Sequence, residues 1–126
     1  LDGGLADSIP VKRASELGNE KIVLMLTRNP GYRKKMTSKA LANVYRRAYR
    51  KYPNLVRTTI RRNFEYNKAM RLVEQMEEEG RIFVLRPLIP TVSRLEKNYD
   101  TLMEFYQHGY HLMKREFGNL MEYLDR

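Results

Sequence analysis

The sequence "KIVLML", residues 21–26, is the stretch that decides the fold class. It is short and almost wholly apolar, and it is rich in β-branched and aliphatic side chains. Strands that are buried on both faces of a parallel sheet have this composition. A second run of the same kind, "RIFVLRP", occupies residues 81–87. The sequence therefore predicts two strands, at residues 21–26 and 81–86.

Helical patterns fill the segment between the two predicted strands. Residues 38–52 begin with Ser38, a good capping residue, and Pro53 interrupts the helix at its end. Residues 53–80 form a longer helical stretch that ends at Gly80, and its apolar side chains recur near helical spacing: Val56, Ile60, Phe64, Met70, Val73 and Met76. Strand, helical crossover and strand are the connections of a parallel sheet, so we predict a helix-rich α/β fold.

Two further helices flank this unit. "PVKRASEL", residues 10–17, predicts a short helix that Asp7 or Ser8 caps and Gly18 ends. Residues 98–126 predict a long helix, with Asp100 as its cap and Gly109 and Gly118 as points of interruption. Its expected apolar face consists of Leu102, Tyr106, Tyr110, Met113, Phe117, Leu120 and Leu124. We expect residues 1–90 to form an α/β segment and residues 91–126 a helical segment that packs on it.

Composition excludes several classes of protein. No run approaches eighteen apolar residues, which excludes a transmembrane helix, and the absence of cysteine excludes disulfides and thiolate metal sites. Glu104, His108 and His111 share one face of the last predicted helix, but no fourth ligand accompanies them. We expect no metal and no cofactor. The composition fits a reducing compartment, and we expect a cytoplasmic protein.

The charge is concentrated in one part of the chain. The net charge is +9, yet residues 28–64 contain twelve Lys or Arg and no Asp or Glu. Arg46 with Arg50, and Arg57 with Arg61, have the spacing that stacks side chains along one helix face. Three interpretations stay open: a solvated surface, a site for an anionic membrane surface formed by Arg46, Arg47 and Arg50, and a nucleic-acid site, which lacks any accompanying motif.

The opening segment, "LDGGLADSIP", contains an Asp-Gly-Gly at residues 2–4. Glycines allow tight turns and close approach of other groups, and loops of parallel α/β proteins often carry functional carboxylates. A structural turn is the simplest interpretation of this tripeptide. Asp2 as a catalytic or metal-binding carboxylate is the functional one.

The longer context of this loop resembles a known family. "DGGLADSIPVKRASELGNEKIVLMLTRNPGYRKK" at residues 2–35, "YPNL" at 52–55 and "EYNKAMRLVEQMEEEGRIFVLRP" at 65–87 are similar to the C-terminal part of the catalytic domain of bacterial patatin-like phospholipases. "VSRLEK" at 92–97 and "YQHGY" at 106–110 continue the match. The resemblance implies part of a three-layer parallel-sheet fold that belongs to a serine acyl hydrolase of lipid esters.

The resemblance also assigns roles to residues in the opening loop. In that family a serine within Gly-x-Ser-x-Gly attacks the ester and an Asp activates it directly, so Asp2 matches the dyad base, and Gly3 and Gly4 match its turn. Asp7 and Ser8 match the neighbouring loop. This chain contains no Gly-x-Ser-x-Gly and no glycine-rich oxyanion loop. The resemblance thus implies a chain that is inactive alone and whose partner is the missing N-terminal part of its own domain.

The sequence therefore supports two hypotheses about function. The first is the C-terminal fragment of a patatin-like lipid acyl hydrolase, with peripheral contact at the inner membrane surface. The alternative is a basic binding module for anionic membrane or nucleic acid that performs no catalysis.

Overall fold

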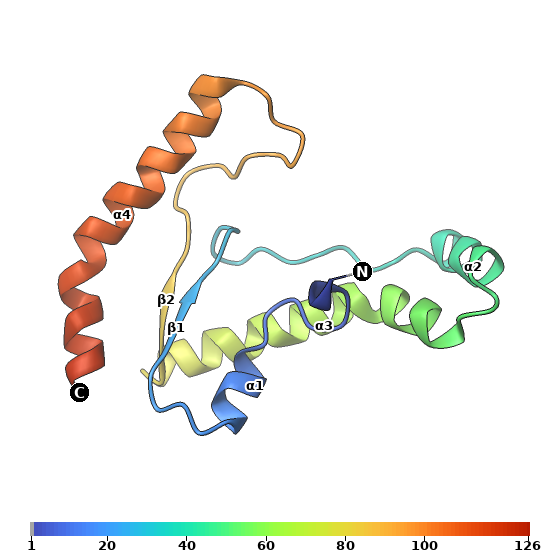
Figure 1. Cartoon of the computed structure of the whole chain (residues 1–126), viewed down its shortest axis with the longest axis horizontal. Coiled ribbons are helices and arrows are strands. Elements are labelled where there is room, and N and C mark those ends of the chain that lie inside the picture. The colour runs from blue at the N-terminus through green and yellow to red at the C-terminus, as the bar shows by residue number, and fades with distance from the viewer. Residues whose placement is uncertain (1) are drawn as a thin grey trace. The chain divides into compact units, whose positions relative to one another are not determined.

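The computed structural model describes residues 2–126, and within them the protein is a helix-rich, mixed α/β chain with one small sheet. The elements in chain order are η1 (Gly3–Leu5), α1 (Val11–Glu16), β1 (Ile22–Met25), α2 (Lys39–Ala48), α3 (Pro53–Glu78), β2 (Ile82–Leu85) and α4 (Tyr99–Asp125) (Figure 1). The two predicted strands pair in parallel, with Ile22 opposite Ile82 and Met25 opposite Leu85. The predicted parallel pairing and helical crossover are confirmed.

The chain divides into two compact units. The first unit contains the described residues up to Asn19 together with Arg33–Met76, and the second contains Glu20–Tyr32 together with Glu77–Arg126. Residue 90, the predicted division between an α/β and a helical segment, falls inside the second unit. That division into residues 1–90 and 91–126 stays a prediction.

In the first unit, Asp7 and Ser8 do not cap α1 as predicted. The helix begins after Pro10, which makes no side-chain capping bond. The Ser8 hydroxyl donates instead to the Gly4 carbonyl at 2.7 Å, and the Asp7 carboxylate accepts from the Ile9 N–H at 3.2 Å. Both side chains close the preceding loop, because short polar side chains bond nearby backbone as readily as they cap helices.

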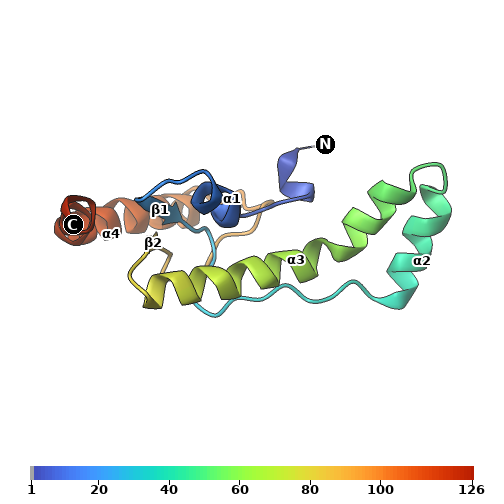
Figure 2. The ribbon, with the colours of Figure 1, turned by 90° about the horizontal axis from the view of Figure 1, so that it is seen from below.

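Helix α2 begins as the sequence predicts, since the Ser38 hydroxyl accepts from the Leu41 N–H at 3.2 Å. It ends at Ala48, four residues before the predicted end at residue 52. Tyr49 leaves the helical conformation with φ −115° and ψ 35°, and a short turn leads to Pro53, the first residue of α3 (Figure 2). Proline suits the first position of a helix but disfavours a helical residue before it, which explains the break.

Helix α3 buries most of the side chains that its periodicity predicts. Val56, Met70, Val73 and Met76 are buried, whereas Phe64 is exposed and Tyr66 is buried in its place. Phe64 precedes Val73 by nine residues and therefore lies about half a turn away from it around the helix. The helix ends before Gly80, whose φ of +67° is a conformation that glycine adopts without strain.

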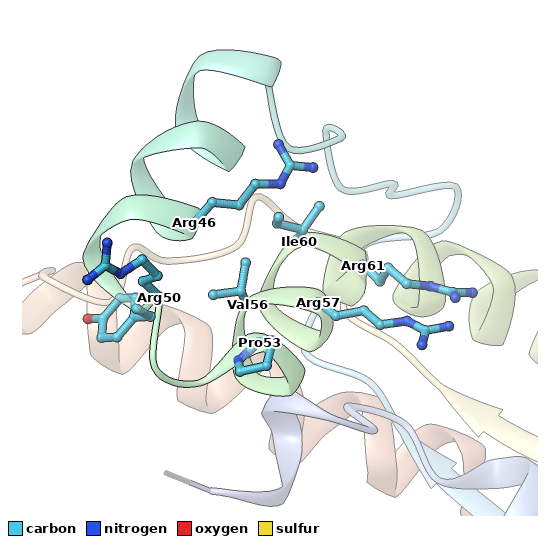
Figure 3. A pocket seen from close by; sticks show the side chains of 8 residues that line it. Arg46, Arg50, Pro53, Val56, Arg57, Ile60 and Arg61 are labelled. Carbon is cyan, nitrogen blue, oxygen red and sulfur yellow. The ribbon is translucent and has the colours of Figure 1, made fainter.

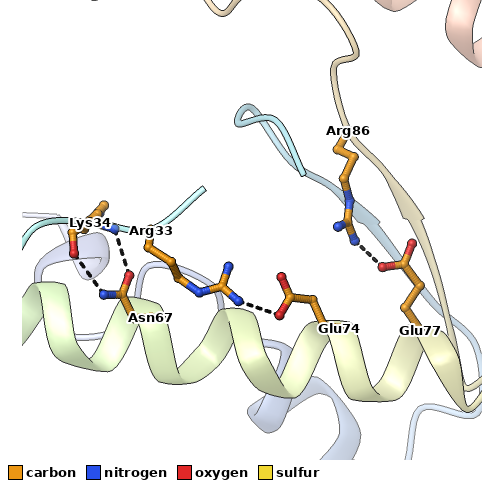
Figure 4. A network of polar contacts seen from close by, with 6 residues as sticks. All are labelled: Arg33, Lys34, Asn67, Glu74, Glu77 and Arg86. Carbon is orange, nitrogen blue, oxygen red and sulfur yellow. Dashed lines mark hydrogen bonds and ion pairs between the residues drawn. The ribbon is translucent and has the colours of Figure 1, made fainter. Parts of the chain in front are cut away.

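The segment of residues 33–37 runs beside α3, and α3 side chains hold its backbone. Asn67 accepts from the Lys34 N–H at 2.8 Å and donates to the Lys34 carbonyl at 2.9 Å (Figure 4). Asn63 donates to the Lys35 carbonyl at 2.7 Å. Residues 33–37 themselves form a loop without helix or strand. Asparagines four residues apart on one helix face convert that loop into an extended strap.

In the second unit, the sheet is less buried than its composition predicts. The exposed fractions of Val23 and Met25 on β1 are 39% and 73%, while Ile82 and Leu85 on β2 are buried. The prediction of a first strand buried on both faces is therefore wrong within the described residues. Within the second unit, α4 contacts β2, and one helix is too few to cover both faces of a two-stranded sheet (Figure 1).

Helix α4 departs from its prediction in three ways. Its cap is Asn98, which accepts from the Thr101 N–H at 3.0 Å, rather than Asp100. Gly109 and Gly118 lie within an unbroken helix, because an interior glycine lowers helix stability by only about 1 kcal/mol. The predicted apolar face is mostly exposed, Tyr106 and Phe117 among its members, and the buried side chain of α4 is Tyr123.

Candidate functional site

The opening loop brings together the five loop residues that the sequence singles out. Asp2 precedes the short helical turn η1, where the Leu5 N–H donates to the Asp2 carbonyl at 3.3 Å. The Asp2 side chain is exposed, and within residues 2–126 it makes no hydrogen bond or ion pair. The carboxylate is therefore available as a proton acceptor or ligand.

Gly4 lets the Asp2 carboxylate approach the backbone closely. A Cβ atom at residue 4 would lie 3.1 Å from Oδ1 of Asp2, whereas one at Gly3 meets nothing within 4 Å. The Ser8 hydroxyl, which donates to the Gly4 carbonyl, holds the other side of the loop. Ser8 thus holds Gly4 in position. The sequence did not predict this role, because the hydrogen bond forms only when the chain turns back between residues 4 and 8.

A charged side chain lies next to this loop in the same unit. Arg62 and Glu65 of α3 line a small cavity together with Asp7 and Ser8. The Arg62 Nε atom is buried and has no hydrogen-bond partner in the described part of the chain. The cavity therefore places one guanidinium group and one carboxylate of α3 beside the opening loop.

The second candidate region is the turn between α2 and α3. A cavity of about 440 Å³ opens there, and it is lined by Arg46, Tyr49, Arg50, Pro53, Val56, Arg57, Ile60 and Arg61 (Figure 3). Of the three arginines predicted to form an anionic-surface site, the structure places Arg46 and Arg50 at this cavity and leaves Arg47 outside it.

Two arginines of α3 complete this cavity and were not predicted as part of the site. The i, i+4 spacing of Arg57 and Arg61 is visible in the sequence, but their position opposite Arg46 is not. That position depends on the turn at residues 49–52, whose hydrogen bond from the Tyr52 N–H to the Tyr49 carbonyl is 2.8 Å. The pair Arg46 and Arg50 and the pair Arg57 and Arg61 therefore line one cavity only because α2 and α3 pack against each other in this arrangement.

A second cavity of similar volume, about 430 Å³, lies in the second unit beside β2 and α4. Its arginines are neutralised. Arg86 pairs with Glu77 (Figure 4), and the pairs Arg115–Glu116 and Arg126–Glu122 follow on α4 and at its end. The Asn119 side chain and then Arg115 donate hydrogen bonds that lower the pKa of Glu116 below its usual value. The lining of this cavity therefore carries ion pairs, and it has no excess of positive charge from its arginines.

The Glu104, His108 and His111 positions on α4 were the candidate metal ligands in the sequence. Residues 2–126 contain no group of three or more His, Cys, Asp or Glu side chains that is suited to hold a metal ion. No helix in the same range combines the length and the apolar character needed to cross a bilayer.

Comparison with known proteins returned one match. No curated protein and no solved structure matches the chain. The family model that matches is described as a domain of unknown function, DUF6363, and it aligns with residues 52–125, from the turn before α3 through α4. Because the match covers more than half of the sequence, the chain belongs to the DUF6363 family.

Proposed function

We propose that the chain is the C-terminal part of a patatin-like lipid acyl hydrolase and that Asp2 is the base of its Ser-Asp dyad. The observation that carries the proposal is the Asp2-Gly3-Gly4 turn, which sits at the start of a stretch resembling that family. Its carboxylate is exposed and makes no side-chain bond within residues 2–126, and Gly4 leaves room for it.

The chemistry that this assigns to Asp2 is proton transfer. The serine Oγ of the remaining part of the domain would attack the ester carbonyl carbon while its proton passes to the Asp2 carboxylate. The proton then goes to the departing alcohol. Water next attacks the acyl-serine carbonyl carbon while Asp2 takes its proton, and that proton returns to the departing serine Oγ as the fatty acid is released. Backbone N–H groups of a glycine-rich loop would stabilise the oxyanion.

The sheet supports the proposal that the partner is the remaining part of the same domain. Val23 and Met25 are exposed on β1, and β1 pairs only with β2 among the described residues. Parallel sheets are found almost exclusively with both faces covered. Further strands and helices of a three-layer patatin-like fold would cover this surface. The lipid ester substrate, and a cytoplasmic location with peripheral contact at the inner membrane surface, belong to the same proposal.

The test is Asp2→Asn in the protein that also contains the Gly-x-Ser-x-Gly segment. Asn keeps the shape of Asp but cannot accept the serine proton, so turnover of a short-chain chromogenic ester should fall about 10²–10⁴-fold with an unchanged circular dichroism spectrum. Asp7→Asn is the matched control, because an amide oxygen still accepts from the Ile9 N–H. Residues 1–126 alone should show no turnover. Near wild-type turnover in Asp2→Asn removes Asp2 from the mechanism.

The second candidate function is a basic binding module without catalysis. The observation that favours it is the arginine-lined cavity between α2 and α3, which lies within a segment free of acidic residues. The sequence of the complete gene distinguishes the two proposed functions. A Gly-x-Ser-x-Gly and a glycine-rich loop encoded upstream of Leu1 favour the hydrolase, and a reading frame that lacks both favours the module.

A further inference from the structure

The cavity between α2 and α3 has an apolar floor. Val56 and Ile60 project from successive turns of α3 toward α2, and Pro53 closes one end (Figure 3). Val56 is buried and the Tyr49 ring is half exposed. The volume of about 440 Å³ lies in the range of roughly 300–1,000 Å³ that is typical of small-molecule sites. An apolar chain placed on this floor would remove further apolar surface from water.

The rim of the same cavity is cationic on both sides. Arg46 and Arg50 come from α2 and the turn after it, and Arg57 and Arg61 come from one face of α3 (Figure 3). Arg61 pairs with Glu65 at 2.8 Å, and Arg46 donates to the neutral Asn43 side chain at 2.9 Å. In the part of the chain that the structure describes, the side chains of Arg50 and Arg57 make no hydrogen bond or ion pair.

The cavity in the second unit provides an internal comparison. It has a similar volume and three arginines, but each of these arginines pairs with a glutamate of its own unit. The cavity between α2 and α3 has four arginines in its lining and no acidic residue there. Among the described residues, Arg61 alone of these four pairs with a carboxylate, that of Glu65, so positive charge is in excess at this cavity and an anion from outside the chain would neutralise it.

We propose that this cavity binds one single-chain amphiphile with a phosphate head group. The alkyl chain would lie on Pro53, Val56 and Ile60. The side chains of Arg50 and Arg57 extend to opposite sides of this floor in Figure 3, and both would turn toward the phosphate when it binds. Guanidinium groups donate paired hydrogen bonds to phosphate oxygens, and such charge-assisted bonds are the stronger ones. The aliphatic floor disfavours single-stranded nucleic acid, whose bases stack on aromatic platforms. This site does not depend on hydrolysis at Asp2.

The experiment titrates dodecyl phosphate, kept below its micellar concentration, into the full chain by isothermal titration calorimetry. We expect saturable binding of one molecule per chain. The double substitution Arg50→Gln/Arg57→Gln should weaken it about 100-fold, since each lost charge-assisted contact is worth about tenfold. Arg47→Gln, which removes an arginine of α2 that does not line the cavity, should bind within about twofold of the wild type. Circular dichroism and thermal unfolding check that every variant is folded.

Four outcomes overturn the proposal. Equal binding of dodecyl maltoside, which has the same chain and a neutral head, would show that the arginines contribute nothing. Equal binding of inorganic phosphate would show that the floor contributes nothing. An equal loss in Arg47→Gln would show a diffuse field rather than a site. Displacement of dodecyl phosphate by short duplex DNA, with a steep dependence on salt, would assign the surface to nucleic acid.

Discussion

Tyr123, near the end of α4, connects the starts of both strands in the second unit. Its hydroxyl accepts from the Ile22 N–H at 2.9 Å and donates to the Arg81 carbonyl at 2.9 Å. Its own carbonyl accepts from the Lys21 ammonium at 2.8 Å, and its ring contacts Phe83. Only 6% of the residue is exposed. One aromatic side chain thus satisfies backbone groups from two segments that are far apart in sequence.

Tyr123→Phe should lower the free energy of unfolding by about 1–3 kcal/mol. The substitution keeps the ring but leaves a partly buried N–H and a carbonyl without their partner. Urea unfolding followed by circular dichroism measures the change. Tyr106→Phe on the exposed side of α4 is the control and should change stability by less than about 0.5 kcal/mol. Equal effects of the two substitutions would contradict a special role for the Tyr123 hydroxyl.

At the scale of elements, the strap of residues 33–37 is held to α3 by side-chain bonds to its backbone. Asn67 and Asn63 bond the backbone of Lys34 and Lys35, and the Arg33 guanidinium contacts Glu74 at 2.5 Å. The Thr37 hydroxyl adds a bond to the Ile60 carbonyl at 3.2 Å. The strap ends next to Ser38, the residue that caps α2. Because the strap is attached to α3, it also holds the start of α2 near α3.

Asn67→Ala should release the strap locally. The Lys34 N–H loses its acceptor and the Lys34 carbonyl loses its donor, so the amide hydrogen of Lys34 should exchange faster with solvent. Hydrogen exchange measured by NMR reports this directly. Asn119→Ala, which removes only an exposed bond to Glu116, should leave the Lys34 exchange rate unchanged. Unchanged exchange in Asn67→Ala would show that Asn63 and Thr37 suffice to hold the strap.

At the scale of the whole molecule, the chain has little fully buried surface and much exposed apolar surface. Val73 is the one large side chain that is completely buried among the described residues. Met25 on β1 and Tyr106, Tyr110 and Phe117 on α4 are exposed. Strands with free edges and exposed apolar side chains pair with other chains unless charges or further elements protect them.

The purified 126-residue chain should therefore self-associate, and Met25→Lys should reduce that association. A lysine on β1 places a charge on the exposed sheet surface, and edge strands of natural proteins use the same device. Analytical ultracentrifugation at several concentrations measures the effect. Met36→Lys, which replaces another exposed methionine that lies outside the sheet, is the control. If the wild type is monomeric at every concentration, or if both variants associate like it, the sheet is not the associating surface.

The sequence by itself determined the local structure of this protein. The apolar runs at residues 21–26 and 81–86 became β1 and β2, because short β-branched runs between turns have few alternatives to a strand. Ser38 and Gly80 marked a helix start and a helix end, since capping bonds and a positive φ depend only on neighbouring residues. The Asp2-Gly3-Gly4 turn was likewise visible in the sequence.

Only the tertiary structure decided which faces are covered and which charges meet. Periodicity marks an apolar stripe on α4, but burial requires a neighbour, and the side of α4 that contacts β2 carries Tyr123 rather than that stripe. Arg46 and Arg50 became part of one cavity with Arg57 and Arg61 because α2 ends at Ala48 and the chain turns before Pro53. Contacts between distant residues depend on such turns, and no local pattern in the sequence encodes the direction in which the chain leaves them.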